Sequence, residues 1–261
     1  MQGDDVNSMS TPGFLWGKSG EDRTRVEELL LRNRPPLDDS WWPWLMERPL
    51  TRRTANKFLL ASSNEYHRTD DVEERVETYV ESFLGPSEGD DLWGHIARLG
   101  EADYKSWLDE ASRFHLHQQL AHLETVWRMA KRLVRLYGGD AREIWAGNPT
   151  PAEVIQTLED DLGLSEELSH MTAGALADRK LIEGRGPLKA DTHVRRVLGR
   201  ILVGRKLSRD EAHIAAEWIH PENPWVIDRS LYTLGIALCH ERRSPECHSC
   251  YMGHECVFVK G

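Results

Sequence analysis

Near its carboxyl end the chain reads Ala190-Asp191-Thr192-His193-Val194-Arg195-Arg196-Val197-Leu198, and farther on it carries every cysteine it has. These four cysteines follow a C-x7-C-x2-C-x5-C spacing, at Cys239, Cys247, Cys250 and Cys256. No earlier part of the chain gathers as many groups able to bind a metal or move a proton. We therefore expect the residues that determine the function to lie in this segment.

The cysteine spacing is typical of a metal site. Residues 1–5 lack the basic and apolar regions of a signal peptide, which favours the cytoplasm, where thiols stay reduced. Spacing alone leaves two metals open. An iron–sulfur cluster takes four thiolates from one compact loop, whereas zinc can also take histidine, and the candidates are His240, His248 and His254. Either metal would stabilise a small carboxyl-terminal lobe with little core of its own.

The charge is unevenly distributed along the chain, whose net charge at pH 7 is −10. Residues 70–110 hold thirteen acidic and three basic residues, whereas residues 185–209 hold eight basic residues and one acidic residue. A local basic surface, not the total charge, decides whether phosphate is attracted. The basic segment is therefore compatible with nucleic acid, although a solvated helix surface is the more common explanation of any one charge run. No apolar run is long enough to span a membrane.

Apolar residues recur at helical spacing and nowhere alternate as in a strand, which predicts an all-α protein. The clearest helix covers 115–137, and Gly138-Gly139 closes it in left-handed backbone. Helices are also expected over 171–182, 192–203 and 226–239. Capping patterns predict further helix starts after Thr150 and Ser208, and Asp191 is a common type of N-cap.

Together these features resemble the iron–sulfur branch of the helix-hairpin-helix DNA glycosylases, the endonuclease III and MutY group. The segments that carry the likeness are Leu188–Val197, Leu231–Cys239 with the cysteines after it, Thr172–Leu176 and the helix ending in Tyr137-Gly138-Gly139. The likeness covers residues 53–256. It implies a two-lobed all-α fold with a [4Fe–4S] cluster on the four cysteines. The expected parts are a flexible segment over 1–25, an arm over 26–52 that packs on the cluster lobe, a helical barrel with the hairpin over 53–187, and the cluster lobe over 188–261.

The resemblance also implies a reaction and its site. Asp191 falls on the catalytic aspartate, whose carboxylate stabilises the positive charge that builds on the sugar as the glycosidic bond breaks. The implied partner is DNA, in the cytoplasm with the nucleoid, and no obligate protein partner is indicated. Asn64 is expected to fill the gap left by the flipped base. The other expected DNA contacts are His170 and Met171 at the hairpin, Arg195, Arg196, Arg200 and Arg205 in the basic segment, and Arg242 and Arg243 in the cysteine loop.

This chain departs from the family pattern at several places, and these departures narrow the expected reaction and the expected mode of DNA binding. Where lyase-type members keep a lysine, this chain has Met171, or His170 one residue earlier, so no amine there can form a Schiff base. This implies a monofunctional glycosylase, which leaves the abasic site uncut. The hairpin's Gly-x-Gly turn is replaced by a longer stretch, Leu164–His170, whose two glutamates oppose a phosphate. The loop after Cys239 has one residue more than usual.

A hypothesis of a different kind, in which the protein is not an enzyme, stays open. The altered hairpin and the acidic surface also suit a catalytically degenerate DNA- or RNA-binding protein on the same iron–sulfur scaffold. In that case Asp191 would only cap its helix. The residues leave open which base an enzyme of this kind would excise.

Overall fold

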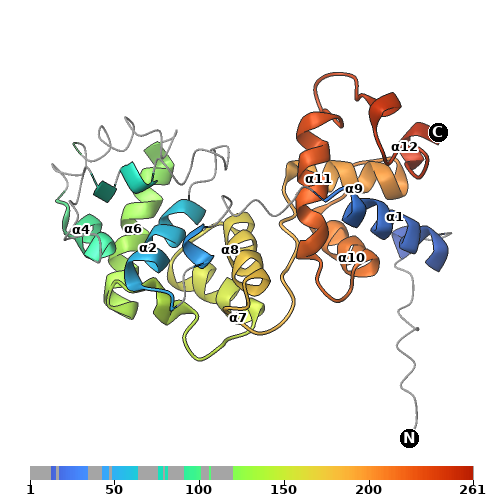
Figure 1. Cartoon of the computed structure of the whole chain (residues 1–261). Coiled ribbons are helices and arrows are strands. Elements are labelled where there is room, and N and C mark those ends of the chain that lie inside the picture. Colours follow the sequence, from blue (N-terminus) through green and yellow to red (C-terminus); the bar gives the residue numbers. More distant parts are fainter. Residues whose placement is uncertain are drawn as a thin grey trace, which may run out of the picture. The chain divides into compact units, whose positions relative to one another are not determined.

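The computed structural model describes residues 13–15, 18–34, 43–46, 49–63, 76–78, 80–81, 91–100, 106 and 120–260. In these ranges the chain forms helices and turns and no strand, which confirms the predicted all-α class. None of the described helices is both long and apolar enough to cross a bilayer. The chain divides into two compact units, shown in Figure 1. The cysteine unit comprises Met1–Pro36 and Arg185–Gly261, and the hairpin unit comprises Leu37–Gly184.

The cysteine unit joins the two ends of the chain. Its elements are the short turns η1 (Gly13–Leu15) and η7 (Cys247–Ser249) and the helices α1 (Gly20–Arg32), α9 (Thr192–Val203), α10 (Arg209–Ile219), α11 (Trp225–Ala237) and α12 (Val257–Lys260). Figure 1 shows α1, in blue, against the orange and red helices from the other end of the sequence. Their apolar faces meet in one core, where Leu30 of α1 lies with Leu198 of α9 and Leu231 of α11.

Glycine allows α9 and α11 to approach closely. A Cβ atom on Gly235 of α11 would lie 2.7 Å from the Cβ atom of His193 on α9. Real Cβ atoms essentially never come that close, so only glycine fits at this crossing without a shift of the helices. This crossing fixes the amino-terminal end of α9, where Asp191 lies.

The hairpin unit is built around a buried helix. Its elements are η3 (Pro43–Met46), α2 (Arg52–Ser62), α4 (Leu92–Arg98), α6 (Leu120–Tyr137), η5 (Ala141–Ile144), α7 (Pro151–Gln156), the π-helical turn η6 (Thr157–Asp161) and α8 (Glu166–Asp178). Phe58, Leu59 and Leu60 of α2 are buried. The Asn56 side chain donates to Gly139 O at 3.1 Å and accepts from Ala141 N at 2.9 Å. These bonds tie α2 to the turn that ends α6.

The hairpin differs from the expected one. The predicted long turn over 164–170 is wrong from residue 166 onward, because α8 begins at Glu166 and only residues 162–165 connect it to η6. Gly163 takes a left-handed φ of 78° in this turn. Ser165 has the extended backbone of an N-cap, and the two glutamates after it favour the positive end of a helix. The helix therefore begins at an N-cap with extended backbone and two acids in its first turn, although the Ser165 side chain forms no capping hydrogen bond.

Other expectations are confirmed or corrected at the level of elements. The caps at Gly138-Gly139, Thr150, Asp191 and Ser208 are all present. The expected flexible segment over 1–25 is partly helical, because α1 starts at Gly20 behind a capping box of Ser19 and Asp22. Of the expected arm, only the part up to Pro36 lies in the cysteine unit, and η3 packs on α2 instead. Residues 115–119 lie outside the described residues.

Candidate functional site

Asp191 ends an extended segment and begins α9. Its backbone is extended, with φ −72° and ψ 178°, and its Oδ1 accepts a hydrogen bond from Val194 N at 2.8 Å. The side chain is buried, and the residue is only 7% exposed. Lys189 Nζ lies 3.9 Å from Asp191 Oδ2. The carboxylate is thus held by the first turn of a helix, with one ammonium group beside it.

The segment before Asp191 is fastened to the start of α11. Asp191 N donates to Lys189 O at 2.7 Å, which makes a tight turn of three residues. Lys189 N in turn donates to Oδ1 of Asp228 at 3.0 Å. Nearer the beginning of the segment, Gly186 N donates to Asn223 Oδ1 at 3.0 Å, and Trp225 N donates to Gly186 O at 2.9 Å. The position of Asp191 therefore depends on residues of α11 and of the turn before it.

Asp228 is a second buried acid near Asp191, and sequence reasoning missed it. The residue is only 5% exposed and lies in the first turn of α11. Burial raises the pKa of Asp228 to about 8, and the negative charge of Asp191 adds to the rise. At neutral pH this carboxyl group is therefore mostly protonated. A signal was present in the sequence, because Asp228 stands three residues before Leu231, on the face that α11 buries.

The basic segment is largely occupied by bonds within the protein. Arg196 is only 3% exposed, and its guanidinium donates to the carbonyls of Gly235 and Cys239 at the end of α11. Arg195 Nε donates to Leu207 O at 3.0 Å, and Arg205 pairs with Glu211. The phosphate contacts expected of these arginines stay predictions, and the described bonds give each of them a structural role.

Two cations of the cysteine loop remain exposed. Arg242 and Arg243 line an open pocket of about 480 Å³ together with Thr192 and His193, which directly follow Asp191. Arg196 also lines this pocket. Three of the arginines expected to contact DNA thus gather beside the start of α9.

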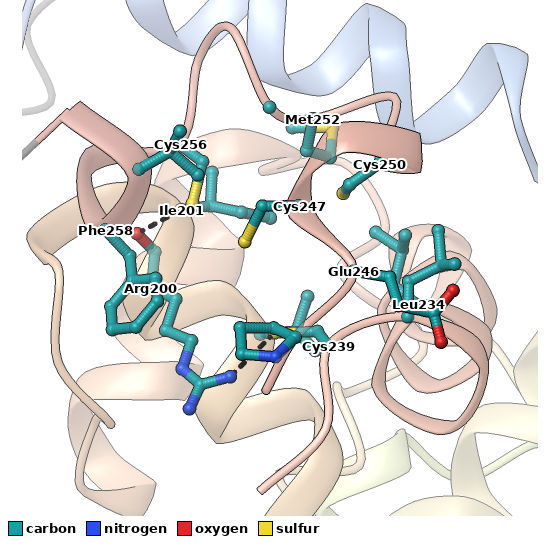
Figure 2. Close-up of a pocket in the computed structure, with 15 residues that line it drawn as sticks. Arg200, Ile201, Leu234, Cys239, Glu246, Cys247, Cys250, Met252, Cys256 and Phe258 are labelled. Carbon is teal, nitrogen blue, oxygen red and sulfur yellow. Dashed lines mark hydrogen bonds between the residues drawn. The ribbon is translucent and has the colours of Figure 1, made fainter. Parts of the chain in front are cut away.

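All four cysteines line one pocket of the cysteine unit, which Figure 2 shows. None of them is in a disulfide. The other lining is mainly apolar and includes Val197, Ile201, Leu234, Met252 and Phe258. No histidine lines it, although His240, His248 and His254 lie nearby in sequence. A set of four sulfur donors around an apolar pocket fits a cluster that binds four thiolates.

Charged and polar groups around the sulfur atoms support this fit. Arg200 Nη1 donates to Cys239 Sγ at 3.2 Å and to His240 O at 2.9 Å. Burial raises the pKa of the Cys250 and Cys256 thiols, and the other cysteines add to the rise. Thiolates crowded in this way need a bound cation to neutralise them, which is what a metal or cluster supplies.

The remaining expected residues belong to the hairpin unit. His170 and Met171 lie half-buried on α8. Asn64 lies outside the described residues.

Comparisons with known proteins identify the fold. No family model and no curated protein matches the chain. Among solved structures, a non-covalent endonuclease III–DNA complex aligns with a TM-score of 0.59 and 14% identity over 91% of this chain and 93% of that one. A thermostable thymine-DNA glycosylase aligns with a TM-score of 0.60 and 13% identity over 92% and 97%. A trapped endonuclease III–DNA covalent intermediate aligns with a TM-score of 0.53 and 16% identity over 92% and 95%. The chain therefore has the helix-hairpin-helix glycosylase fold, as the sequence predicted.

Proposed function

We propose that this protein is a DNA glycosylase that uses water to hydrolyse the N-glycosidic bond of a damaged, mismatched or modified base. The observation that carries the proposal is Asp191, a buried acid at the amino-terminal end of α9 in a chain with a glycosylase fold. The DNA complexes named among its structural neighbours support DNA as the substrate. A substrate of this kind would place the protein with the nucleoid.

The reaction needs one fixed negative charge. As the bond to the base breaks, positive charge develops at C1′ of the sugar, and a carboxylate beside that carbon stabilises it. The hydrogen bond from Val194 N holds Oδ1 of Asp191, so Oδ2 is the oxygen left to face the sugar and orient the water. A base inside the duplex must leave the stack to reach such a group.

We propose that no lyase step follows. A Schiff base needs an unprotonated amine, and the amine of Lys189 beside Asp191 is engaged as the counter-ion of that carboxylate. The position where related lyases keep their lysine holds Met171 on α8, or His170 one residue earlier, and neither side chain is a primary amine. Borohydride should therefore trap no covalent adduct between the protein and a duplex that already contains an abasic site. An adduct that disappears in Lys189→Arg would reveal a lyase instead.

We propose that Cys239, Cys247, Cys250 and Cys256 hold a [4Fe–4S] cluster. When bound, the cluster supplies four covalent links between the end of α11 and the loop before α12, and no step of bond cleavage. Its contribution to the reaction is indirect, because α9 and α11, which position Asp191, also line the cysteine pocket. Arg242 and Arg243 in the same loop are the proposed phosphate contacts.

The test does not require the base to be known. A duplex with a cationic pyrrolidine in place of one nucleotide mimics the charged sugar, and a duplex with neutral tetrahydrofuran is its matched control. The wild-type protein should bind the pyrrolidine duplex more tightly, and Asp191→Asn should lose about tenfold or more of that preference. Oligonucleotides with a panel of lesions then identify the base, as strand scission after hot alkali that Asp191→Asn abolishes.

One observation favours the non-catalytic alternative. The first turn of α8 presents Glu166 and Glu167, whereas a hairpin that binds phosphate offers backbone N–H groups free of negative charge. A purely binding protein would take both duplexes equally well and would leave every lesion intact.

A further inference from the structure

Asp228 has a place in the fold that its own helix does not explain. It is a buried acid within a helix face that otherwise packs apolar residues such as Ile227 and Leu231. A carboxyl group buried in such a place costs stability unless hydrogen bonds compensate it. Its one described hydrogen bond is the one that it accepts from Lys189 N.

This bond continues into the site. Lys189 N–H is bound by Asp228, Lys189 C=O accepts from Asp191 N at 2.7 Å, and Asp191 Oδ1 caps α9. The three residues 189–191 are therefore held at both ends, by α11 on one side and by α9 on the other. If the hydrogen bond from Lys189 N to Asp228 were lost, the carboxylate of Asp191 could shift away from its position.

We propose that Asp228 is a positioning residue for Asp191, and that it acts through its carbonyl oxygen, as a neutral hydrogen-bond acceptor for the Lys189 N–H. The proposal rests on the proposed function, because Asp191 must be the reacting carboxylate for its position to matter. It adds a residue on a second helix that sets where the reacting group lies.

The surroundings of Asp228 explain why the neutral form serves here. The charged groups that act on it are Asp191, which opposes its ionisation, and Lys189, which favours it. Burial is the larger influence and keeps the proton on the group at neutral pH. An ionised Asp228 would compete with Asp191 for the same Lys189 ammonium, whereas the neutral group leaves that ammonium beside Asp191.

Two substitutions separate the acceptor from the charge. Asp228→Asn keeps a neutral carbonyl oxygen at the same place, so it should keep the preference for the pyrrolidine duplex over the tetrahydrofuran duplex within about twofold. Asp228→Ala removes the acceptor and leaves the part-buried Lys189 N–H without its bond to position 228, so it should lose about tenfold of that preference. Asp210→Ala, at an exposed acid of α10, is the matched control and should change nothing.

The ratio of the two affinities separates positioning from general damage, because both duplexes contact the same protein. Unchanged preference in Asp228→Ala overturns the proposal. Equal losses in the Asn and Ala variants also overturn it, because they would show that the charge matters and the acceptor does not.

A second readout does not depend on the proposed function. Exchange of the Lys189 amide proton should be slow in the wild-type protein and in Asp228→Asn, and faster in Asp228→Ala by about tenfold or more. If exchange follows this pattern while the wild-type protein ignores the pyrrolidine charge, the glycosylase function has failed and the hydrogen bond stands. If exchange does not change in Asp228→Ala, the positioning role itself is wrong.

Discussion

At the scale of single residues, two aspartates of the cysteine unit serve one segment in different ways. Asp191 caps α9 through Oδ1, which leaves Oδ2 for the chemistry we propose, while Asp228 accepts a hydrogen bond from the backbone N–H of Lys189, two residues before Asp191. Burial acts on both, but only Asp228 lies on an apolar helix face. The pair illustrates how the environment, and not the residue type, assigns the role of a carboxyl group.

The raised pKa of Asp228 makes stability depend on pH. Its value of about 8 in the fold lies above the ordinary 3.8, so the folded protein keeps a proton that the unfolded chain releases between these values. The contribution of Asp228 to stability is therefore fully present below about pH 4 and is lost as the pH rises toward about 8. Asp228→Asn should gain stability relative to the wild-type protein over this window, and the gain should level off above it.

Urea unfolding of both proteins at about pH 5, about pH 7 and about pH 9 measures this difference. Asp210→Asn, at an exposed acid, supplies the control for a simple change in net charge. A difference between Asp228→Asn and the wild-type protein that stays constant over all three values would contradict the prediction.

The sequence predicted that Asp191 caps a helix, but it did not point to Asp228 as a neighbouring buried acid. The cap of Asp191 is local, because the apolar pattern of α9 begins directly after it. The partner of Asp228 is Lys189, which is distant in sequence and is brought near by the crossing of α9 and α11. A pattern within one helix marks an acid on a buried face but does not name what it binds.

At the scale of elements, the crossing of α9 and α11 depends on one glycine. An alanine at position 235 would place its Cβ atom 2.7 Å from His193 Cβ, which belongs to the neighbouring helix and has little room to move. We expect Gly235→Ala to cost about 1–3 kcal/mol of stability, as overpacked substitutions do. It should also weaken the pyrrolidine preference, because the helix that carries Asp191 would shift.

Gly20→Ala is the matched control, because a Cβ atom there meets nothing within 4 Å and the residue begins α1. It should leave stability unchanged or raise it slightly, since alanine suits a helix better than glycine. Thermal unfolding of the two variants gives the comparison. A Gly235→Ala protein as stable as the wild type would show that the two helices separate at no cost.

Two helix starts were predictable from capping patterns within a few residues of sequence. The starts of α7 and α10 were predicted from Thr150-x-x-Glu153 and Ser208-x-x-Glu211, and both capping boxes are present. The start of α8 at Glu166 differs from the longer turn that the family's hairpin pattern predicts, and Ser165 with the two glutamates after it is the local signal for this start. A serine before two acids is a sequence signal for a helix start, and α8 begins there although the Ser165 side chain forms no capping hydrogen bond.

At the scale of the whole molecule, the distribution of charge along the sequence is a poor guide to where phosphate could bind. The basic segment over 185–209 suggested a surface for phosphate, but Arg195, Arg196, Arg200 and Arg205 all bind groups of the protein. The bonds of Arg195, Arg196 and Arg200 join α9 to the end of α11 and to the loop before α10, and the bond of Arg205 joins this loop to α10. Arg242 and Arg243, in the loop that the cysteine spacing defines, are also exposed and line the open pocket beside the start of α9.

The cysteine pocket gives the most direct test at this scale. Cys239 follows the end of α11, Cys256 precedes α12, and Val197 and Ile201 of α9 line the space between them. A bound cluster would therefore link the end of α11 to the loop before α12 and would lie against α9, which begins after Asp191. We expect Cys247→Ser to lose iron, sulfide and the brown colour of a cluster, and to loosen the cysteine unit, because the free energy of metal binding is coupled to folding.

Hydrogen exchange read peptide by peptide distinguishes the two units. In Cys247→Ser, peptides from 185–260 should exchange faster, whereas peptides from 120–184, in the hairpin unit, should keep their protection. Ser249→Ala, at an exposed non-ligand position of the same loop, should behave as the wild type. If the wild-type protein is colourless and contains zinc, the bound metal is zinc, the other metal that the cysteine spacing allows, and not an iron–sulfur cluster. A protein without any metal, and with equal exchange in Cys247→Ser, would show that the four thiols are not ligands.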